Sequence, residues 1–337
     1  MDKYRLVVFG DHWDVYQVAH RDWIEDPLVR YVSTFRPAGL LGQVQRLHFN
    51  PRINAICPLP FKPCWNPYYL RGVDDGHLCF LVTEPWLRME SGMRLLPYLR
   101  RRYPHSRIVC FTQDMVDTIL DLYTCRPIDL PYLRKYADLL ISYDTTDARQ
   151  YDMLYHPTVY SPLHIAEKDQ RPLYDLYFLG RDKGRLSQLI EICHEATRRG
   201  LRCHFLMLEV PKRDQIVCEG ITYLKRALPY AENLRLCAQS RCIVEMLQQH
   251  AASATFRTWE TIMLNRKLLT NNASIATSDF YDSRYISVFD SPAHIDWRFV
   301  QSETAFPDGN NPYQQRIRPL SLIHFLEQKL NIHIAHS

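Results

Sequence analysis

Short apolar runs alternate with amphipathic or polar segments along most of the chain, and this alternation limits the folds that it can adopt. Runs of this length that end in polar residues are typical of buried parallel strands. They occur at 5–10, 77–85, 107–114 and within 137–151, and again at 174–180, 203–210, 241–247, 267–272 and 285–290. Helical spacing predicts helices at 186–200, near 231–240, from 256 onwards and at 317–330. We therefore predict an α/β protein with parallel sheets.

The two series of strands and helices are similar in length and are joined by a segment rich in proline. A chain of 337 residues is long enough for two domains. Pro157, Pro162 and Pro172 interrupt regular structure after Tyr151. We predict two Rossmann-like domains facing a cleft, at 1–165 and 166–312, with a closing C-terminal helix and tail at 313–337.

The composition indicates a soluble, cytoplasmic protein. Hydrophobic residues make up 46% and charged residues 23% of the chain, and the first apolar run is too short for a signal-peptide core. Ten cysteines without a CxxC pair are expected to be reduced thiols, and no zinc-ligand spacing is present. The net charge is +4, and no RNA-binding motif occurs. We therefore expect no bound metal and no nucleic-acid partner.

The segment 53–70 is rich in proline and aromatic residues and predicts a loop. Its aromatic side chains either contact an acceptor or a lipid surface, or pack against their own domain: Phe61, Trp65, Tyr68 and Tyr69. A cluster of arginines lies further along the chain, at positions 94, 100, 101, 102 and 107. This cluster is either a basic face, suited to peripheral contact with the inner membrane, or a solvated helix end.

The sequence FLGRDKGR at 178–185 predicts an anion-binding loop. Gly180 follows an apolar strand and permits a tight turn, and the next helix directs its positive end towards the loop. Arg181, Lys183 and Arg185 add cationic donors, which suits a diphosphate. Neither GxxxxGK[ST] nor GxGxxG is present. The alternative interpretation is a glycine turn with solvated charges.

The sequence TFRTWE at 255–260 predicts the start of an amphipathic helix. Three apolar residues share one face, namely Phe256, Trp259 and Met263. Ser253 or Thr255 can cap the helix, and Arg257 and Glu260 project from a neighbouring face. These two charged residues either share a ligand, with the carboxylate of Glu260 bonded to ribose hydroxyls, or form a surface ion pair.

With these motifs the chain resembles a known family. FLGRDKGR, RCIVEML, TFRTWETIMLNRKLLTNN and DFYDSRYISVFD look like the donor-binding half of GT-B glycosyltransferases, and RIVCFTQDMVD with LRKYADLLISYD resembles the end of their amino-terminal domain. The resemblance covers about residues 105–290 and is closest to the bacterial lipopolysaccharide, capsule and spore-maturation (CgeB-like) type. It implies transfer of a sugar from a nucleotide sugar to a cell-surface glycan or lipid-linked glycan, which the amino-terminal domain binds.

Carried over to this chain, the resemblance places Gly180, Arg181 and Lys183 near the diphosphate. It places Thr255 and Arg257 near phosphate as well, and Glu260 near ribose or sugar hydroxyls. The sequence departs from the family at HAASATF, where Ala252, Ser253 and Ala254 replace a glycine-rich run. This departure favours the alternative, a non-catalytic homologue that binds glycans or proteins. A third possibility is a sugar-nucleotide epimerase.

The loop GDHWD after the first strand offers a general base. Transfer with inversion needs a base near the acceptor hydroxyl, and Asp11 or His12 is the predicted residue, with Asp14 beside them. The alternative is a loop that caps the first helix, and transfer with retention would need no such base. Because GT-B enzymes stabilise the leaving diphosphate with a helix dipole and cations, and no DxD occurs, we expect neither a metal nor a cofactor.

Overall fold

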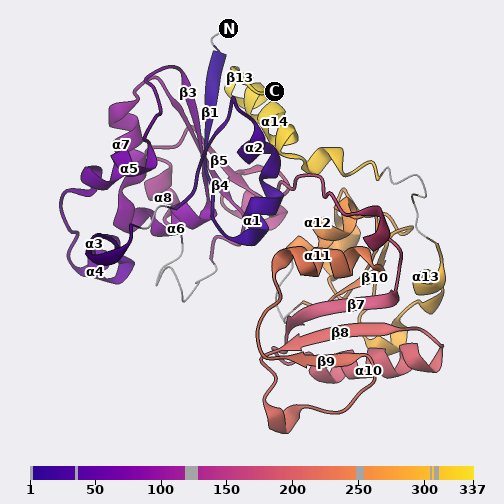
Figure 1. The fold of residues 1–337 in the computed structure, drawn as a ribbon. Coiled ribbons are helices and arrows are strands. Elements are labelled where there is room, and N and C mark those ends of the chain that lie inside the picture. Colours follow the sequence, from indigo (N-terminus) through magenta and orange to yellow (C-terminus); the bar gives the residue numbers. More distant parts are fainter. Residues whose placement is uncertain (1–2, 35–36, 118–127, 248–253, 304–305, 307–310) are drawn as a thin grey trace. The chain divides into compact units, whose positions relative to one another are not determined.

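The computed structural model describes residues 3–34, 37–117, 128–247, 254–303, 306 and 311–337, and the chain forms two compact units (Figure 1). The first unit contains Met1–Ser161 and Ile317–Ser337, and the second contains Pro162–Arg316. The C-terminal helix and tail therefore belong to the same unit as the N-terminus. Among the described residues, no helix is both long and apolar enough to cross a bilayer.

The first unit is built on a parallel sheet that is buried on both faces. Its strand order is β13 (His333–Ala335), β1 (Lys3–Phe9), β3 (Leu78–Thr83), β4 (Arg107–Thr112), β5 (Leu139–Ser142) and β6 (Leu154–Tyr155), and β2 (Arg30–Val32) also pairs with β1. Strand alternation directs Val7 and Phe9 into one hydrophobic core and Leu6 and Val8 into another. Burial on both faces explains why these strands are continuous apolar runs in the sequence.

Helices cover both faces of this sheet. The first core receives side chains from α6 (Glu84–Met93), α7 (Leu95–Arg102) and α8 (Leu130–Leu133). The second core receives them from α2 (Arg21–Glu25) and α14 (Pro319–Leu330). The remaining helices of the unit are α1 (Asp14–Ala19), α3 (Gly39–His48), α4 (Pro51–Ile56), η1 (Lys62–Trp65), α5 (Asn66–Tyr69) and α9 (Thr145–Gln150).

The prediction of a loop at 53–70 is wrong in part, because this segment contains the end of α4, followed by η1 and α5. Pro51, Pro63 and Pro67 lie at the first positions of these helices, where a proline removes no helical hydrogen bond. The aromatic residues divide between the two alternatives. Trp65 and Tyr69 pack in the core of their own unit, whereas Phe61 and Tyr68 are exposed.

The second unit has a six-stranded parallel sheet. Its strand order is β12 (Ile286–Val288), β11 (Lys267–Thr270), β10 (Ser240–Glu245), β7 (Tyr174–Arg181), β8 (Cys203–Leu208) and β9 (Ile221–Leu224). One face packs against α10 (Leu186–Arg198) and α13 (Trp297–Gln301), and the other packs against α11 (Tyr230–Ala238). Also present are α12 (Phe256–Met263), η2 (Glu167–Asp169), η3 (Lys212–Asp214), η4 (Ala273–Thr277) and η5 (Pro292–His294); η6 (Gln315–Ile317) leads back to the first unit.

Each sheet has a topological switch point, where successive strands are added on opposite sides of the first strand. In the second unit β8 and β9 extend from one side of β7, and β10, β11 and β12 extend from the other. In the first unit β2 pairs with one side of β1 and β3 with the other. Ligands of open α/β sheets bind beyond the carboxyl ends of the strands at such points. The two switch points therefore define where a site is expected.

The arginine cluster at 94–107 is largely neutralised. Nη2 of Arg100 lies 2.5 Å from Oδ2 of Asp138, and Nη1 of Arg107 lies 3.7 Å from Oδ1 of the same residue. Nη2 of Arg102 lies 2.7 Å from Oδ1 of Asp75. Three of the five arginines thus face aspartates, which weakens the case for a basic face at this position.

Candidate functional site

The switch point of the second sheet brings together the two segments that the sequence singled out. FLGRDKGR spans the end of β7 and the loop after it, and TFRTWE follows β10. The guanidinium of Arg185 donates to the main-chain oxygen of Met246, just after β10. Nη2 of Arg257 donates in the other direction, to the main-chain oxygen of Leu179 in β7, at 3.3 Å. Two arginines therefore tie the segments to each other.

The loop after β7 turns tightly through two residues with positive φ, Lys183 (φ 46) and Gly184 (φ +80). Gly180 lies within β7 and not in this turn, where the sequence placed it. A Cβ at this position would lie 2.8 Å from Phe178 Cζ and 3.0 Å from Arg185 Nη2, so a larger residue would require one of these side chains to shift. The guanidinium of Arg185 is used within the protein: it donates to the carbonyls of Asp182, Met246 and Arg181 and lies over the ring of Phe178. Burial lowers the pKa of Arg185. This side chain shapes the loop.

Two cations of the loop face solvent. Arg181 is exposed and its Nε lies 3.1 Å from Oε1 of Glu209. Lys183 is exposed, and no ion pair or side-chain hydrogen bond links it to the described residues. The amides at the start of α10 are partly occupied, because Oδ1 of Asp182 accepts from the amides of Arg185 and Leu186 at 3.1 and 3.0 Å. Lys183 is therefore the cation of this loop best able to meet an anion.

The amino end of α12 is fixed by a buried carboxylate that the sequence analysis missed. Thr255 caps the helix, with its Oγ1 accepting from the amide of Arg257 at 3.1 Å. The same hydroxyl donates to Oε1 of Glu245 at 2.5 Å, and Thr258 donates to this oxygen at 3.1 Å. Thr270 donates to Oε2 of Glu245 at 2.6 Å. Glu245 thus joins the ends of β10 and β11 to the start of α12.

Arg257 and Glu260 form a buried ion pair, in contrast to the surface pair that was one sequence-based interpretation. Nη1 of Arg257 lies 2.7 Å from Oε2 of Glu260, whose side chain is only 2% exposed. The other carboxylate oxygen accepts from the hydroxyl of Tyr230 at 2.7 Å. Burial, the largest single effect, acts to lower the pKa of Arg257, but Glu260 and other neighbouring groups together outweigh it, and the net pKa is raised. Arg257 also donates to Oδ1 of Asn233 at 3.1 Å.

The structure therefore brings the predicted residues of the second unit to one switch point. They form a packed inner layer of side chains and an outer layer that faces solvent. Gly180, Arg185, Thr255, Arg257 and Glu260 form the packed and hydrogen-bonded layer described above. Arg181 and Lys183 form the solvent-facing layer. Of the HAASATF segment, Ala252 and Ser253 lie outside the described residues.

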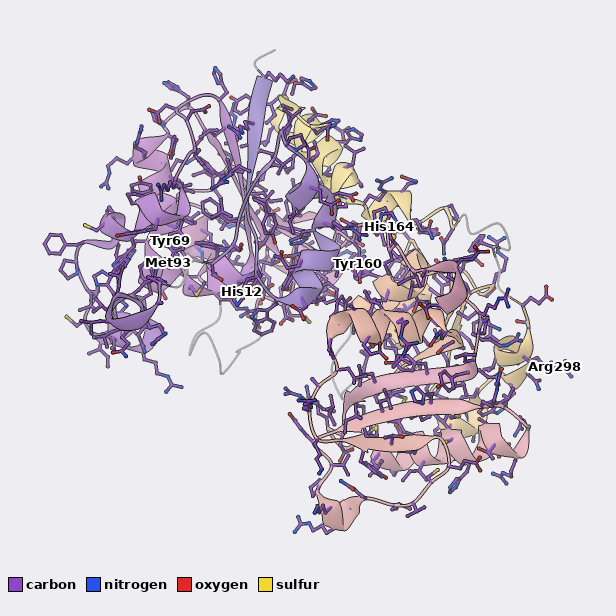
Figure 2. The ribbon with its side chains drawn as sticks, viewed as in Figure 1. His12, Tyr69, Met93, Tyr160, His164 and Arg298 are labelled. Atoms are coloured by element: carbon purple, nitrogen blue, oxygen red, sulfur yellow. The ribbon has the colours of Figure 1, made fainter. Side chains whose placement is uncertain are left out.

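At the switch point of the first sheet, Asp11 and His12 follow β1 and form a carboxylate–imidazole pair. Figure 2 shows His12 in the first unit. Asp11 is 5% exposed and its Oδ1 lies 2.9 Å from Nδ1 of His12, whose side chain is 46% exposed. Nδ1 of His12 also lies 2.7 Å from Oγ1 of Thr34. The main chain of Asp11 is held by Tyr31, which accepts from its amide at 3.0 Å and donates to its carbonyl at 3.1 Å. The pair has a buried, fixed acid and an exposed ring.

Glu84, at the end of β3, is a second carboxylate that the sequence analysis did not single out. It is buried, it pairs with Arg88, and its Oε2 accepts from the amide of Gln113 at 2.6 Å. Burial raises the pKa of Glu84 to about 7, although Arg88 acts in the opposite direction. The only signal in the sequence was the polar end of the run HLCFLVTEP, which does not reveal that the acid is buried.

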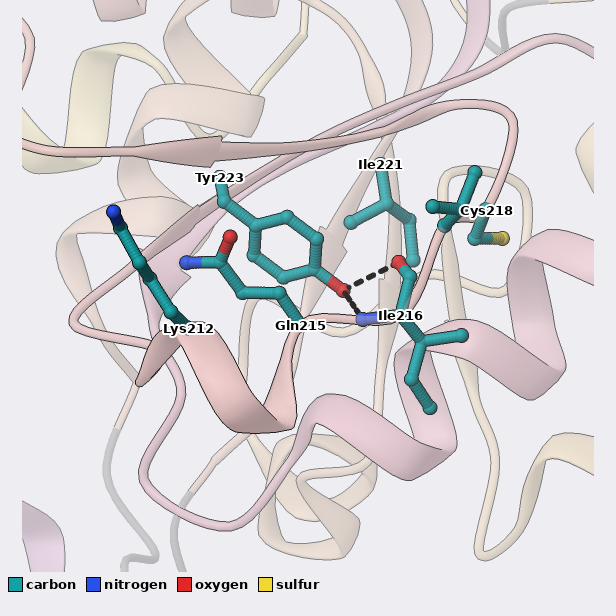
Figure 3. A pocket seen from close by; sticks show the side chains of 7 residues that line it. Lys212, Gln215, Ile216, Cys218, Ile221 and Tyr223 are labelled. Carbon is teal, nitrogen blue, oxygen red and sulfur yellow. Dashed lines mark hydrogen bonds between the residues drawn. The ribbon is translucent and has the colours of Figure 1, made fainter.

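A pocket of about 460 Å³ lies elsewhere on the second unit and contains none of the residues discussed above (Figure 3). Its lining comes from η3, β9 and the segment between them: Lys212, Gln215, Ile216, Val217, Cys218, Ile221 and Tyr223. The hydroxyl of Tyr223 accepts from the amide of Ile216 at 3.0 Å and donates to its carbonyl at 2.9 Å. Because β9 is the outer strand, this pocket is separate from the switch point between β7 and β10.

No protein-family model matches the sequence, and no curated protein sequence matches it. Solved structures match over nearly the whole chain. An alpha-glucosyltransferase in complex with UDP and a 13-mer DNA containing an HMU base has a TM-score of 0.58 at 9% identity, covering 97% of this chain and 99% of that one. AviGT4, a glycosyltransferase involved in avilamycin A biosynthesis, has a TM-score of 0.54 at 11% identity, covering 97% of both chains.

A third structure, a glycosyltransferase from Rickettsia africae, has a TM-score of 0.50 at 7% identity and covers 98% of this chain and 99% of that one. Likeness at such low identity shows the fold. The predicted architecture of two parallel-sheet α/β domains of the GT-B type is confirmed.

Proposed function

We propose that this protein is a glycosyltransferase that uses a nucleotide sugar as donor and binds it at the switch point between β7 and β10. The observation that carries the proposal is the arrangement at this point, where an exposed lysine without an ion pair among the described residues follows β7 and a capped helix follows β10. Both features favour an anion. The likeness to a glucosyltransferase crystallised with UDP supports the same ligand class.

In this proposal the residues of the donor site have two kinds of role. Lys183 binds the diphosphate directly, with Arg181 beside it once its ion pair with Glu209 exchanges. Gly180 and Arg185 shape the loop, and Thr255 fixes the amino end of α12 near phosphate. The expected contact of Glu260 with ribose or sugar hydroxyls requires it to exchange its bond with Tyr230, and Arg257 mainly holds this carboxylate in place.

For the chemical step we propose that His12 is the general base and Asp11 its positioning residue. With Nδ1 of His12 directed to Asp11, the other ring nitrogen takes the proton of the acceptor hydroxyl. The hydroxyl oxygen then forms a bond to the anomeric carbon of the donor while the bond from that carbon to the diphosphate oxygen breaks. The leaving nucleoside diphosphate carries away the bonding electrons and is stabilised by Lys183 and helix ends, so the proposed reaction requires no metal or cofactor.

We further propose that the first unit binds the acceptor, which is a cell-surface glycan, or a lipid-linked glycan, of lipopolysaccharide or capsule type. We propose that the protein itself is located in the cytoplasm and makes peripheral contact with the inner membrane face. Nucleic acid is not part of the proposal, although the alpha-glucosyltransferase was crystallised with DNA. Assays with DNA beside glycan acceptors distinguish these acceptor classes.

An exposed apolar face in the first unit supports the membrane contact better than the arginine cluster does. Leu40, Val44 and Leu47 share one face of α3 and are 75%, 46% and 58% exposed. Ile56 after them is 89% exposed and Phe61 is 74% exposed. The surrounding chain, residues 27–73, contains no aspartate or glutamate. An apolar helix face within an acid-free segment suits the surface of an anionic bilayer.

A non-catalytic homologue is the second candidate, and two contacts favour it. Asp182 already occupies the first amides of α10, and both oxygens of Glu260 accept hydrogen bonds from within the protein. The experiment that separates the candidates incubates the purified chain with nucleotide sugars and glycan acceptors and measures release of the nucleoside diphosphate. An enzyme releases it only when donor and acceptor are both present, whereas a binding protein releases none.

A further inference from the structure

Helix α14 and the C-terminal tail bring together two imidazoles and a carboxylate that no part of the proposed function uses. His324 and Glu327 are three residues apart on α14, and His336 follows β13. One ligand atom of each lies within 4.8 Å of the others. The rings of His324 and His336 have centroids 5.7 Å apart.

The backbone explains why residues from the helix and the tail meet. Asn331 ends α14 in the left-handed conformation (φ 51), and its amide donates to the carbonyl of Glu327. The chain then turns back, and β13 pairs in parallel with Lys3–Arg5 of β1. This return brings His336 to α14. The cluster therefore depends on the turn and on strand pairing, both of which are regular elements of the fold.

The carboxylate of Glu327 is held in a fixed position. Its Oε1 accepts from the amide of Ile334 at 2.8 Å, and Nδ1 of His333 lies 2.7 Å from the same oxygen. The side chain of Glu327 is 19% exposed. Hydrogen bonds of this kind, from groups behind the ligands, orient the carboxylates of metal sites and tune their affinity.

We propose that His324, Glu327 and His336 form a binding site for a divalent transition metal ion of the zinc class. Two imidazoles and one carboxylate, with a fourth position open to water, are a common donor set for zinc. Ligand atoms at about 2.0–2.2 Å from a tetrahedral zinc ion lie about 3.4 Å apart. The three atoms lie within 4.8 Å of one another and would have to draw together by up to about 1.4 Å to hold the ion. A bound ion would fasten the C-terminal tail to α14 and so hold β13 on the edge of the sheet.

This site is separate from the proposed reaction. β13 pairs with the amino-terminal half of β1, whereas Asp11 and His12 follow the carboxyl end of that strand. The ion therefore has a structural role, and the proposed transfer without a metal is unaffected by it. Failure of one proposal leaves the other standing.

The test is a titration of the full chain with Zn²⁺ by calorimetry, after treatment with a chelator. The wild type should bind one more ion than His324→Ala or His336→Ala, or bind it at least about tenfold more tightly. His294→Ala is the matched control, because His294 is 70% exposed and lies 2.7 Å from Asp290 but is not part of a described three-ligand cluster. It should bind Zn²⁺ as the wild type does.

A second measurement separates a metal ligand from a residue that only stabilises the fold. Zn²⁺ should raise the midpoint of thermal unfolding of the wild type and of His294→Ala, and leave that of His336→Ala unchanged, because an ion bound only to the native state stabilises it. Equal stoichiometry and affinity in all four proteins would overturn the proposal. An equal rise of the midpoint in His336→Ala would do so as well.

Discussion

Arg257 and Glu260 lie one turn apart on α12, with Nη1 of the arginine 2.7 Å from Oε2 of the glutamate and both side chains largely withdrawn from solvent. The pair also bonds to Tyr230 on α11 and to Leu179 in β7. The i, i+3 spacing of this ion pair is common on helix surfaces. Here the pair is buried and joins two helices and a strand in the interior of the second unit.

Removal of one partner should destabilise the second unit strongly. Arg257→Ala leaves a buried carboxylate without its cation, and we expect a loss of about 3–5 kcal/mol in the free energy of unfolding. The double variant Arg257→Met with Glu260→Leu should lose less than the sum of the two single changes, because neither charge is then left unpaired. Urea unfolding measures both effects, and additive losses would contradict the coupling.

Glu90 should make stability fall as the pH rises. It is buried, accepts from the amides of Leu95 and Leu96 at 3.1 and 3.0 Å, and burial raises its pKa from 4.5 to about 8. Between these values the folded state holds a proton that the unfolded state has lost. The free energy of unfolding therefore decreases from about pH 4.5 to pH 8 and levels off above.

The measurement for Glu90 is urea unfolding at several pH values for the wild type and for Glu90→Gln. The difference between the two proteins removes the contributions of other groups, such as His20, whose pKa burial lowers to about 3. In Glu90→Gln, the free energy of unfolding should not show the decrease between pH 4.5 and pH 8 that is assigned to this carboxyl group. Curves that remain parallel over the whole interval would show that Glu90 is not protonated in the folded state.

Asp11 and His12 should affect the rate of transfer and not donor binding. His12→Ala removes the proposed base, and we expect the rate constant to fall by about 10²–10⁴ while nucleotide affinity stays unchanged. Asp11→Asn should give a smaller loss, because the ring remains but is no longer oriented by a carboxylate. Asp14→Asn is the control, since Asp14 is exposed at the start of α1. A normal rate in His12→Ala would remove this residue from the mechanism.

The exposed face of α3 should bind anionic lipid. Flotation with phosphatidylglycerol vesicles should recover the wild type, and phosphatidylcholine vesicles should recover much less. The double variant Leu40→Ser with Leu47→Ser should lose this binding, whereas Ile216→Ser with Val217→Ser should keep it. These control residues are also exposed, at 55% and 102%, but belong to the second unit. Equal recovery of both double variants would argue against a membrane contact through α3.

The main strands could be predicted from the sequence because a strand buried on both faces is an uninterrupted apolar run. β1, β3, β4 and β7 illustrate this. The short strands β2, β6 and β13 could not, since two or three residues give no period. β12 is equally short, but the longer run at 285–290 that contains it was visible in the sequence. The short helices in 51–69 were not predicted, because the prolines of this segment were interpreted only as helix breakers. Proline is also favoured in the first turn of a helix, where these residues lie.

The two candidate segments could be predicted, and their internal contacts could not. A glycine turn with cations and a helix start with a threonine cap are local patterns, and local patterns are visible in a sequence. Glu245 and Glu84 are different, because a carboxylate at the end of a strand has the same sequence signal whether it faces solvent or is buried. Their role depends on Thr270 approaching Glu245, and the amide of Gln113 approaching Glu84, in the folded chain.

The central claim, a nucleotide-sugar site at the switch point between β7 and β10, is tested most directly by thermal unfolding with UDP, GDP, CMP, ADP and dTDP. Lys183→Ala is the preferred variant because Lys183 is exposed, whereas Arg257→Ala also disturbs a buried ion pair. Lys225→Ala is the control, because Lys225 is exposed and follows the outer strand β9. We predict that one nucleotide raises the unfolding midpoint of the wild type and of Lys225→Ala but not of Lys183→Ala. No rise with any nucleotide, or the same rise in Lys183→Ala, would contradict the claim.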